Sequence, residues 1–166
     1  MSNTDAFLVL PDAPTIPGLT FRLFQGEADI PVLKAVREAV QVVDGNIWLP
    51  GPDTVSNPAC DPAQDCLLVE VNGIGIGYSW LDWWEEVDGT RLYLLPGWIV
   101  PEWRHKGIGR ALLHWQEQRL RQIAQTHPAT GPFIFGANAD ESQPASRALL
   151  LSEGYSVAFT FVDRVC

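Results

Sequence analysis

The chain has 166 residues, 46% of them hydrophobic and 19% charged, and its formal net charge is −9. This length suits one sizeable core and is too short for two ordinary domains, and the composition excludes a disordered chain. The acidic balance excludes sequence-independent nucleic-acid binding, because such binding needs many Lys and Arg side chains to neutralise phosphates.

The N-terminal residues show no targeting segment. The apolar patch at Phe7–Leu10 has no basic stretch before it, and prolines interrupt the residues after it. We therefore expect residues 1–18 to be an extension and residues 19–166 to form a single cytoplasmic domain without a membrane partner. The cysteines form neither a CxxC pair nor a cluster with the histidines, so no metal site is expected.

The domain is predicted to begin with a strand and a helix. The run at 19–24 predicts a strand, and apolar residues at helical spacing predict a helix over 27–40. Residues 49–65 hold four prolines among Gly, Asp, Ser and Asn, which indicates a long irregular connection. Loops of this length in compact domains are often functional.

A β meander is predicted after this connection. Strand-like segments at 66–71 and 74–84 flank Asn72-Gly73, which is a hairpin signal because both turn positions need positive φ. Residues 90–100 predict a third strand, rich in Leu, Ile, Val and aromatic side chains. Pro96-Gly97 lies inside it, and since proline cannot donate to a strand ladder, we expect a kink there.

The second half alternates helices and strands. The clearest helix is predicted over 107–125, followed by a strand at 133–137, a helix at 142–153 and a strand at 155–162. Gly154 is expected to end the later helix in a left-handed conformation. This order predicts an α/β fold in which a mixed sheet carries helices on its faces.

The segment from Trp98 to Leu113 passes from a strand through a basic, glycine-containing loop into an amphipathic helix. The first turn of a helix presents unpaired N–H groups and a partial positive charge, and glycine lets the backbone approach an anion closely. The loop therefore suits a pyrophosphate. Two other glycine motifs fit poorly, because the GxxxxGK[ST] sequence of a P-loop is absent and the third glycine of GxGxxG would fall at Leu112.

Arg104-His-Lys-Gly107-Ile-Gly109-Arg-Ala111 resembles the (Q/R)xxGx(G/A) motif of the GNAT N-acetyltransferase superfamily, and the element order resembles that family from about Leu19 to Val162. The resemblance implies a central mixed, mostly antiparallel sheet flanked by helices, with a splayed strand pair that holds coenzyme A. It also implies direct transfer of an acetyl group from acetyl-CoA, the cosubstrate, to a primary amine on a small molecule or protein, without a metal. Homodimers are common among proteins that resemble this one.

In such a fold, strand backbone groups bind the pantetheine arm, and a strand N–H, here that of Trp98 or Ile99, stabilises the developing oxyanion. The glycine loop binds the pyrophosphate, and Gln143 replaces the usual Asn of a late-helix motif. The coenzyme-binding residues that the resemblance implies are Trp98, Ile99, Val100, Arg104, His105, Lys106, Gly107, Ile108, Gly109, Arg110, Ala111 and Gln143.

The catalytic candidates depart from the family pattern. Tyr93 stands where many members carry an acidic residue and is a candidate to relay a proton, as is Asp82 on the preceding hairpin. Leu150 replaces the Tyr that often protonates the leaving thiolate, so Ser146, Tyr155 or water would supply that proton. A second interpretation is a non-catalytic acyl-CoA-binding or regulatory module, such as one half of a tandem acetyltransferase.

Five tryptophans gather in sequence around the predicted cleft-forming strands. They can either wall the acceptor site, together with the 49–65 loop, or pack as ordinary core and surface residues. Trp80 and Trp84 share strand parity and Trp83 opposes them, so all three cannot line one face of a regular strand. The five are Trp80, Trp83, Trp84, Trp98 and Trp103.

Overall fold

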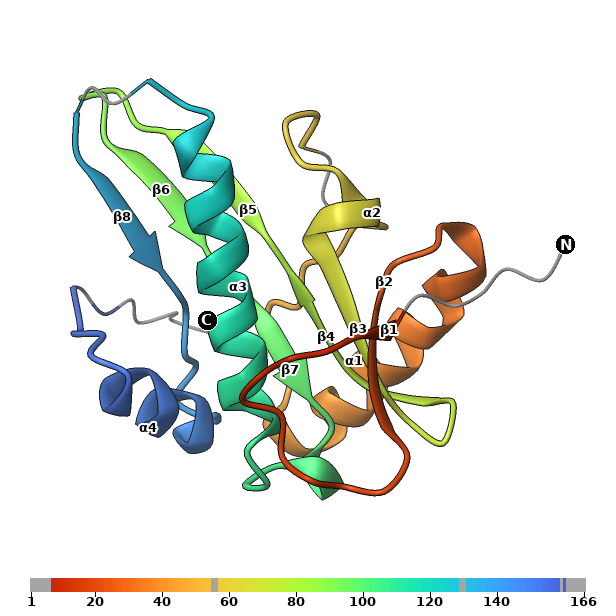
Figure 1. Ribbon diagram of the computed structural model, residues 1–166. Coiled ribbons are helices and arrows are strands. Elements are labelled where there is room, and N and C mark those ends of the chain that lie inside the picture. The colour runs from red at the N-terminus through yellow and green to blue at the C-terminus, as the bar shows by residue number, and fades with distance from the viewer. Residues whose placement is uncertain (1–6, 55–56, 129–130, 159, 161–166) are drawn as a thin grey trace, which may run out of the picture.

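The computed structural model describes residues 7–54, 57–128, 131–158 and 160 (Figure 1). Its strands are β1 (Phe7–Leu8), β2 (Leu19–Leu23), β3 (Cys66–Val71), β4 (Ile74–Trp80), β5 (Asp82–Glu85), β6 (Arg91–Leu94), β7 (Gly97–Ile99) and β8 (Phe133–Gly136). Its helices are α1 (Ile30–Asp44), α2 (Pro62–Asp65), α3 (Ile108–Gln125) and α4 (Pro144–Ser152), with short 3-10 turns at Glu27–Asp29 and Pro101–Trp103. The predicted order of helices and strands is confirmed as far as α4, and the structure adds two elements that were not predicted, β1 in the N-terminal extension and α2 in the connection at 49–65.

Five strands form one antiparallel sheet in the order β1-β2-β3-β4-β7. The β3–β4 hairpin turns at Asn72 and Gly73, whose φ angles of 51° and 77° confirm the predicted turn. β3 is buried along its whole length. The sheet therefore forms the centre of the core, and β1 adds N-terminal residues to its edge.

The other three strands form a second sheet in the order β5-β6-β8, in which β6 pairs antiparallel with β5 and parallel with β8. The predicted strands 74–84 and 90–100 are therefore each divided between the two sheets. At the first division Leu81 N donates to Asp65 O (3.1 Å), and at the second Pro96 has no N–H to donate. The predicted mixed, mostly antiparallel arrangement is confirmed.

The two long helices cover opposite faces of these strands. Figure 1 shows α3 in front of the strands and α1 behind the five-stranded sheet. α1 buries a stripe of Leu33, Val36 and Val40, as expected for an amphipathic helix on a core. α3 contributes Leu113 and Leu120 to a second cluster that covers the smaller sheet. None of the described helices is long and apolar enough to cross a membrane.

The end of α4 agrees with the sequence prediction. Gly154 has a φ of 91°, and Tyr155 N donates to Leu150 O at 3.0 Å, the long bond of a Schellman motif. The strand predicted over 155–162 is not formed by its described residues, which have no ladder partner in the described part of the chain. Its other residues lie outside the described ranges.

Candidate functional site

Two parallel strands separate at the predicted kink. β6 pairs with β8 over its whole length, and the last bond between the two segments joins Leu95 N to Gly136 O (3.0 Å). Beyond Pro96 the chain leaves β8 and pairs with β4 as β7. One edge of β7 therefore has no strand beside it among the described residues, and the splayed strand pair is confirmed.

A buried glutamine fixes this kink. Pro96 O accepts from Trp80 N (3.0 Å) and from Gln116 Nε2 (2.8 Å), and Gln116 is 2% exposed on α3. A Cβ on Gly97 would lie 3.5 Å from Gln116 Oε1 and 3.6 Å from Ser79 Cβ, so the backbone approaches α3 closely here. Sequence reasoning missed Gln116, although a glutamine on the apolar face of a helix is a usable signal.

The ladder between β4 and β7 decides which backbone groups face the open edge. Val100 N donates to Ile76 O (2.8 Å), and antiparallel ladders alternate hydrogen-bonded with non-hydrogen-bonded pairs. Trp98 therefore bonds toward β4 as well, whereas Gly97 and Ile99 present their N–H groups to the open edge. Of the two N–H groups predicted to face the thioester, that of Trp98 therefore points toward β4 and that of Ile99 faces the open edge, as does that of Gly97.

The glycine loop enters α3 through two left-handed residues. His105 has a φ of 62° and Gly107 a φ of 89°, a conformation that costs least for glycine. α3 begins at Ile108, and no side chain caps its first turn. The N–H groups of that turn have no side-chain partner, which is the arrangement that anion binding at a helix start requires.

Two of the four predicted cations of this loop are already paired. Arg104 makes two bonds to the Asp44 carboxylate (2.8 and 2.6 Å), and Arg110 Nε donates to Glu153 Oε1 (2.6 Å). His105 and Lys106 are exposed at the loop. Of the four basic residues predicted to bind the coenzyme, Arg104 and Arg110 thus also form ion pairs within the chain, whereas no ion pair of His105 or Lys106 is seen among the described residues.

Asp44 joins three parts of the site. Its side chain is 1% exposed at the end of α1 and accepts from Arg104 and also from Gln143 Nε2 (3.1 Å), just before α4. Arg104 Nε in turn donates to Ile99 O (2.9 Å). Asp44 thus ties the glycine loop, the end of β7 and the start of α4 together, a role that sequence reasoning missed.

A cavity of about 200 Å³ lies against this network. Four residues singled out from the sequence gather there, namely Arg104, His105, Gln143 and Ser146. The cavity lies between the glycine loop and the start of α4. Its position suits the part of a coenzyme that extends beyond the pyrophosphate.

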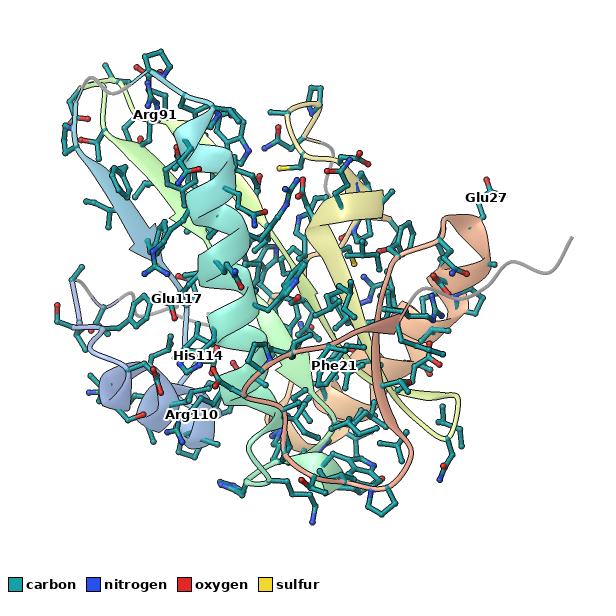
Figure 2. All side chains as sticks on the ribbon, in the orientation of Figure 1. Phe21, Glu27, Arg91, Arg110, His114 and Glu117 are labelled. Carbon is teal, nitrogen blue, oxygen red and sulfur yellow. The ribbon has the colours of Figure 1, made fainter. Side chains whose placement is uncertain are left out.

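The far side of the glycine loop is covered by α4 and by the N-terminal segment. His114 Nδ1 contacts Asp12 Oδ2 (2.5 Å) and its Nε2 contacts Glu153 Oε2 (2.7 Å). These two carboxylates raise the pKa of His114, Glu153 most strongly. Figure 2 shows Arg110 and His114 on the side of α3 that meets α4. A Cβ on Gly109 would lie 3.4 Å from Leu149 Cδ2, so glycine here lets α4 pack closely on α3.

Tyr93 lies in the core and not at the open edge. Its side chain is fully buried, its hydroxyl lies 2.6 Å from His127 Nδ1, and burial raises its pKa. The structure therefore gives Tyr93 a packing role and does not support the predicted proton relay.

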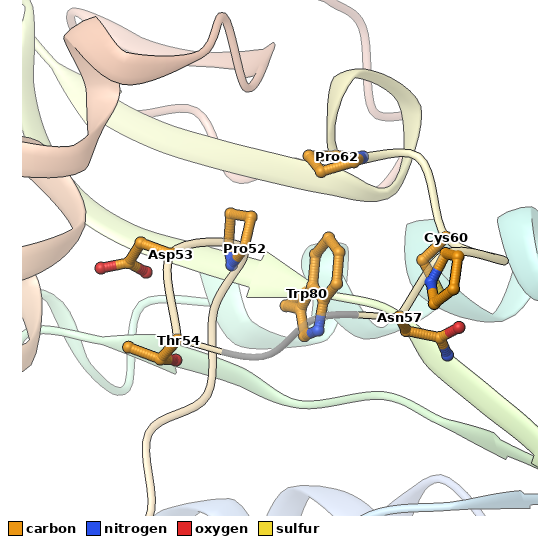
Figure 3. A pocket seen from close by; sticks show the side chains of 8 residues that line it. Pro52, Asp53, Thr54, Asn57, Cys60, Pro62 and Trp80 are labelled. Carbon is orange, nitrogen blue, oxygen red and sulfur yellow. The ribbon is translucent and has the colours of Figure 1, made fainter.

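A second cavity, of about 310 Å³, lies between the connection that follows α1 and Trp80 of β4 (Figure 3). Asp82 does not line it but contacts two residues that do. Asp82 Oδ1 accepts from Asn57 Nδ2 (2.5 Å) and from Trp83 N (2.9 Å), and Cys60 Sγ lies 3.8 Å away. Asn57 and Cys60 both line the cavity. Asp82 is therefore connected to this cavity through Asn57 and Cys60.

The tryptophans do not form one wall. Trp98 packs on Tyr78 with ring centroids 5.1 Å apart, and Trp83 packs on His127 at 4.3 Å. Trp84 is 40% exposed. Trp80 alone of the five lines either cavity. The break between β4 and β5 sends these side chains to different surfaces, so the aromatic-wall hypothesis is reduced to one residue.

Comparison with known proteins supports this geometry. The profile of the acetyltransferase (GNAT) family matches residues 33–129, more than half of the chain. A GCN5-related N-acetyltransferase from Sphaerobacter thermophilus is 21% identical with a TM-score of 0.65, over 89% of this chain and 45% of that one. A ribosomal-protein-alanine N-acetyltransferase from Brucella melitensis biovar Abortus is 16% identical with a TM-score of 0.60, over 89% and 98%. yncA from Salmonella typhimurium, solved with acetyl-CoA as its cofactor, is 21% identical with a TM-score of 0.56, over 86% and 82%.

At these identities the structural likeness shows a shared fold, and this chain spans less than half the length of the Sphaerobacter protein. No curated protein sequence matches the chain. Within the described residues, no group of three or more His, Cys, Asp or Glu side chains could hold a metal ion. Acetyl-CoA fits the site as cosubstrate, since the splayed strands and the glycine loop are both present. The family profile and this fold together show that the chain belongs to the acetyltransferase (GNAT) family.

Proposed function

We propose that the chain transfers the acetyl group of acetyl-CoA directly to a primary amine on a small molecule or a protein. The observation that carries the proposal is the open edge of β7, where the N–H groups of Gly97 and Ile99 face away from β4 beside the start of α3. Backbone donors held in a ladder need no rearrangement when charge develops on a bound thioester.

Three groups of hydrogen-bond donors bind different parts of acetyl-CoA. The uncapped first turn of α3, with His105 and Lys106, holds the pyrophosphate. The backbone of Ile99 pairs with the pantetheine arm, and the amide of Gly97 or Ile99 faces the thioester carbonyl. Gly107 supports this arrangement because its left-handed φ of 89° turns the chain into α3 without a side chain over the anion.

The chemical step requires a neutral amine. An alkyl amine has a pKa near about 10, so a base must remove a proton before nitrogen attacks the thioester carbon. Asp82 is our candidate for that base, acting directly or through water. A C–N bond then forms as the C–S bond breaks, the nitrogen gives up its surplus proton to water, and the thiolate takes a proton from Ser146, Tyr155 or water.

A non-catalytic acyl-CoA-binding or regulatory module is the second candidate function. Leu150, which stands in place of the usual Tyr, packs with Tyr155 in the cluster beneath α4 and has no proton to give. The hydroxyl of Tyr155 is also poorly suited to ionise, because burial raises its pKa. These observations would also suit half of a tandem protein that binds coenzyme A without turnover.

Calorimetric titration with acetyl-CoA tests the coenzyme site. Gly107→Glu places a carboxylate in the anion site, and Gly89→Glu is its matched control, since Gly89 has a similar left-handed φ (86° against 89°) in a hairpin turn. We expect micromolar binding that Gly107→Glu abolishes and Gly89→Glu retains. Release of free thiol with an amine panel then separates the enzyme from the module. The absence of binding by the folded natural chain would contradict both functions.

A further inference from the structure

Apolar and polar groups both line the cavity below the connection after α1. Pro52, Pro58 and Pro62 line its walls, and the Trp80 indole lies between the Pro52 segment and Cys60 in the view of Figure 3. Its volume of about 310 Å³ is at the small end of ligand cavities, which span about 300 to 1,000 Å³. It therefore suits a small molecule or the end of a larger one.

The charge at one side of the cavity is already neutralised. Asp53 lines it, but both of its carboxylate oxygens bond to the guanidinium of Arg37, at 2.9 Å for the longer contact. This ion pair holds the pKa of Asp53 below its ordinary value. Neither charge of the pair is available to a ligand.

The other polar side chains of the lining are also bonded within the chain. Thr54 Oγ1 bonds to both backbone groups of Gly51 (3.1 and 3.2 Å). Asn57 donates to Asp82 and accepts from Ala59 N (3.0 Å). Burial raises the pKa of the Cys60 thiol to about 12, so it stays neutral near pH 7.

Trp80 is the one lining residue whose polar side-chain group is buried and unpaired within the described chain. Its side chain is 1% exposed, and its Nε1–H has no hydrogen-bond partner among the described residues. A buried donor left unpaired costs about 1–3 kcal/mol, so an oxygen that reaches Nε1 when the lining opens around a ligand would be favoured. Since no unpaired cation lines the cavity within the described residues, that oxygen is uncharged.

A backbone hydrogen bond connects the cavity lining to the strand that carries the proposed reaction centre. Trp80 N donates to Pro96 O, the residue before Gly97, whose amide faces the open edge of β7. Asp82 contacts the lining residues Asn57 and Cys60 through its Oδ1, and its Oδ2 accepts from no described residue. One carboxylate is thus placed to meet one ammonium group or to take its proton.

We propose that this cavity holds the acceptor, and that the acceptor is a primary amine with an uncharged oxygen, as in an amino amide, that accepts from Trp80 Nε1–H. This inference rests on the proposed acetyl transfer and narrows its substrate class. It disfavours amines without an oxygen, amino acids with a free carboxylate, and polycations, because the described lining offers neither a free cation nor several free carboxylates.

Three probes differ only at the carbon that bears the amine. Leucinamide carries a carboxamide there, leucine a carboxylate, and 3-methylbutylamine hydrogen. The indole signals of ¹⁵N-labelled protein are assigned with Trp80→Phe and Trp83→Phe. Trp83 is the matched control, because its Nε1 is also buried without a partner in the described chain but does not line the cavity.

We expect leucinamide to shift the Trp80 signal and leave that of Trp83 unmoved, with or without coenzyme A, and to bind about tenfold tighter than the other two probes. Trp80→Phe should lower kcat/KM for leucinamide about tenfold and remove the preference, whereas Trp83→Phe should not. Equal rates for leucinamide and 3-methylbutylamine with an unmoved Trp80 signal would overturn the inference and leave acetyl transfer intact. If leucine bound more tightly than leucinamide, the claim that the recognised oxygen is uncharged would be wrong.

Discussion

Replacing Asp44 by Asn removes the charge at the centre of the coenzyme site. The Asp44 side chain is 1% exposed and makes two bonds to Arg104, whose side chain is 19% exposed. Breaking a buried ion pair by removing one partner costs about 3–5 kcal/mol, and asparagine keeps one acceptor oxygen, so we expect about 3 kcal/mol. For a protein of this size that corresponds to a fall in Tm of about 6–12 °C.

Asp29→Asn is the matched control at the opposite end of α1, about 22 Å away along the helix. Asp29 is also buried, and it bonds twice to Arg22 (2.8 and 2.7 Å). Both variants should lose stability in thermal unfolding. Only Asp44→Asn should weaken acetyl-CoA binding in calorimetry, by about tenfold, because Arg104 then no longer holds the glycine loop against Ile99 O.

Equal coenzyme affinity in both variants would mean that the Asp44 network is a purely structural element. Tighter binding by Asp44→Asn would contradict the prediction in another way. That result would mean that Arg104 prefers the phosphates and that Asp44 withholds it.

Two further substitutions test contacts outside the coenzyme site. Because Glu153 and Asp12 raise the pKa of His114, the contacts of the protonated ring stabilise the fold below pH of about 6.5 and lose that contribution as the pH rises through the raised pKa. The Tm difference between the natural chain and His114→Gln should therefore shrink between about pH 6 and about pH 9; a constant difference would contradict the assignment. Tyr93→Phe should cost about 1 kcal/mol in denaturant unfolding, through the lost contact with His127, and leave kcat within about threefold. A hundredfold fall in kcat would instead indicate that Tyr93 takes part in proton transfer.

Features set by neighbours in the chain could be predicted from the sequence. Asn72-Gly73 and Gly154 have the positive φ angles that their positions require. Pro96 breaks its strand because it has no N–H to offer. The same local logic identified the glycine loop, since a strand, two glycines and a helix succeed one another within a few residues.

Features set by distant partners could not be predicted. Arg104 is separated from Asp44 by 60 positions. The positive charge of Arg104 could therefore be read from the sequence, but its ion-pair partner could not. Tyr93 stands at the position where many family members carry an acidic residue. Its side chain is buried, however, and its hydroxyl contacts His127, which the sequence does not indicate. The division between β4 and β5 at Leu81 depends on a bond to Asp65 O, which no periodicity reveals.

Each step of the proposed reaction requires acetyl-CoA to bind along the open edge of β7 and at the start of α3. Backbone amide signals of ¹⁵N-labelled protein titrated with acetyl-CoA reveal where it binds. We predict large shifts for Gly97, Ile99 and the first turn of α3, and smaller ones for Trp98 and Val100, whose amides bond toward β4. Saturable shifts confined to other surfaces, or no shifts at all, would contradict this binding site.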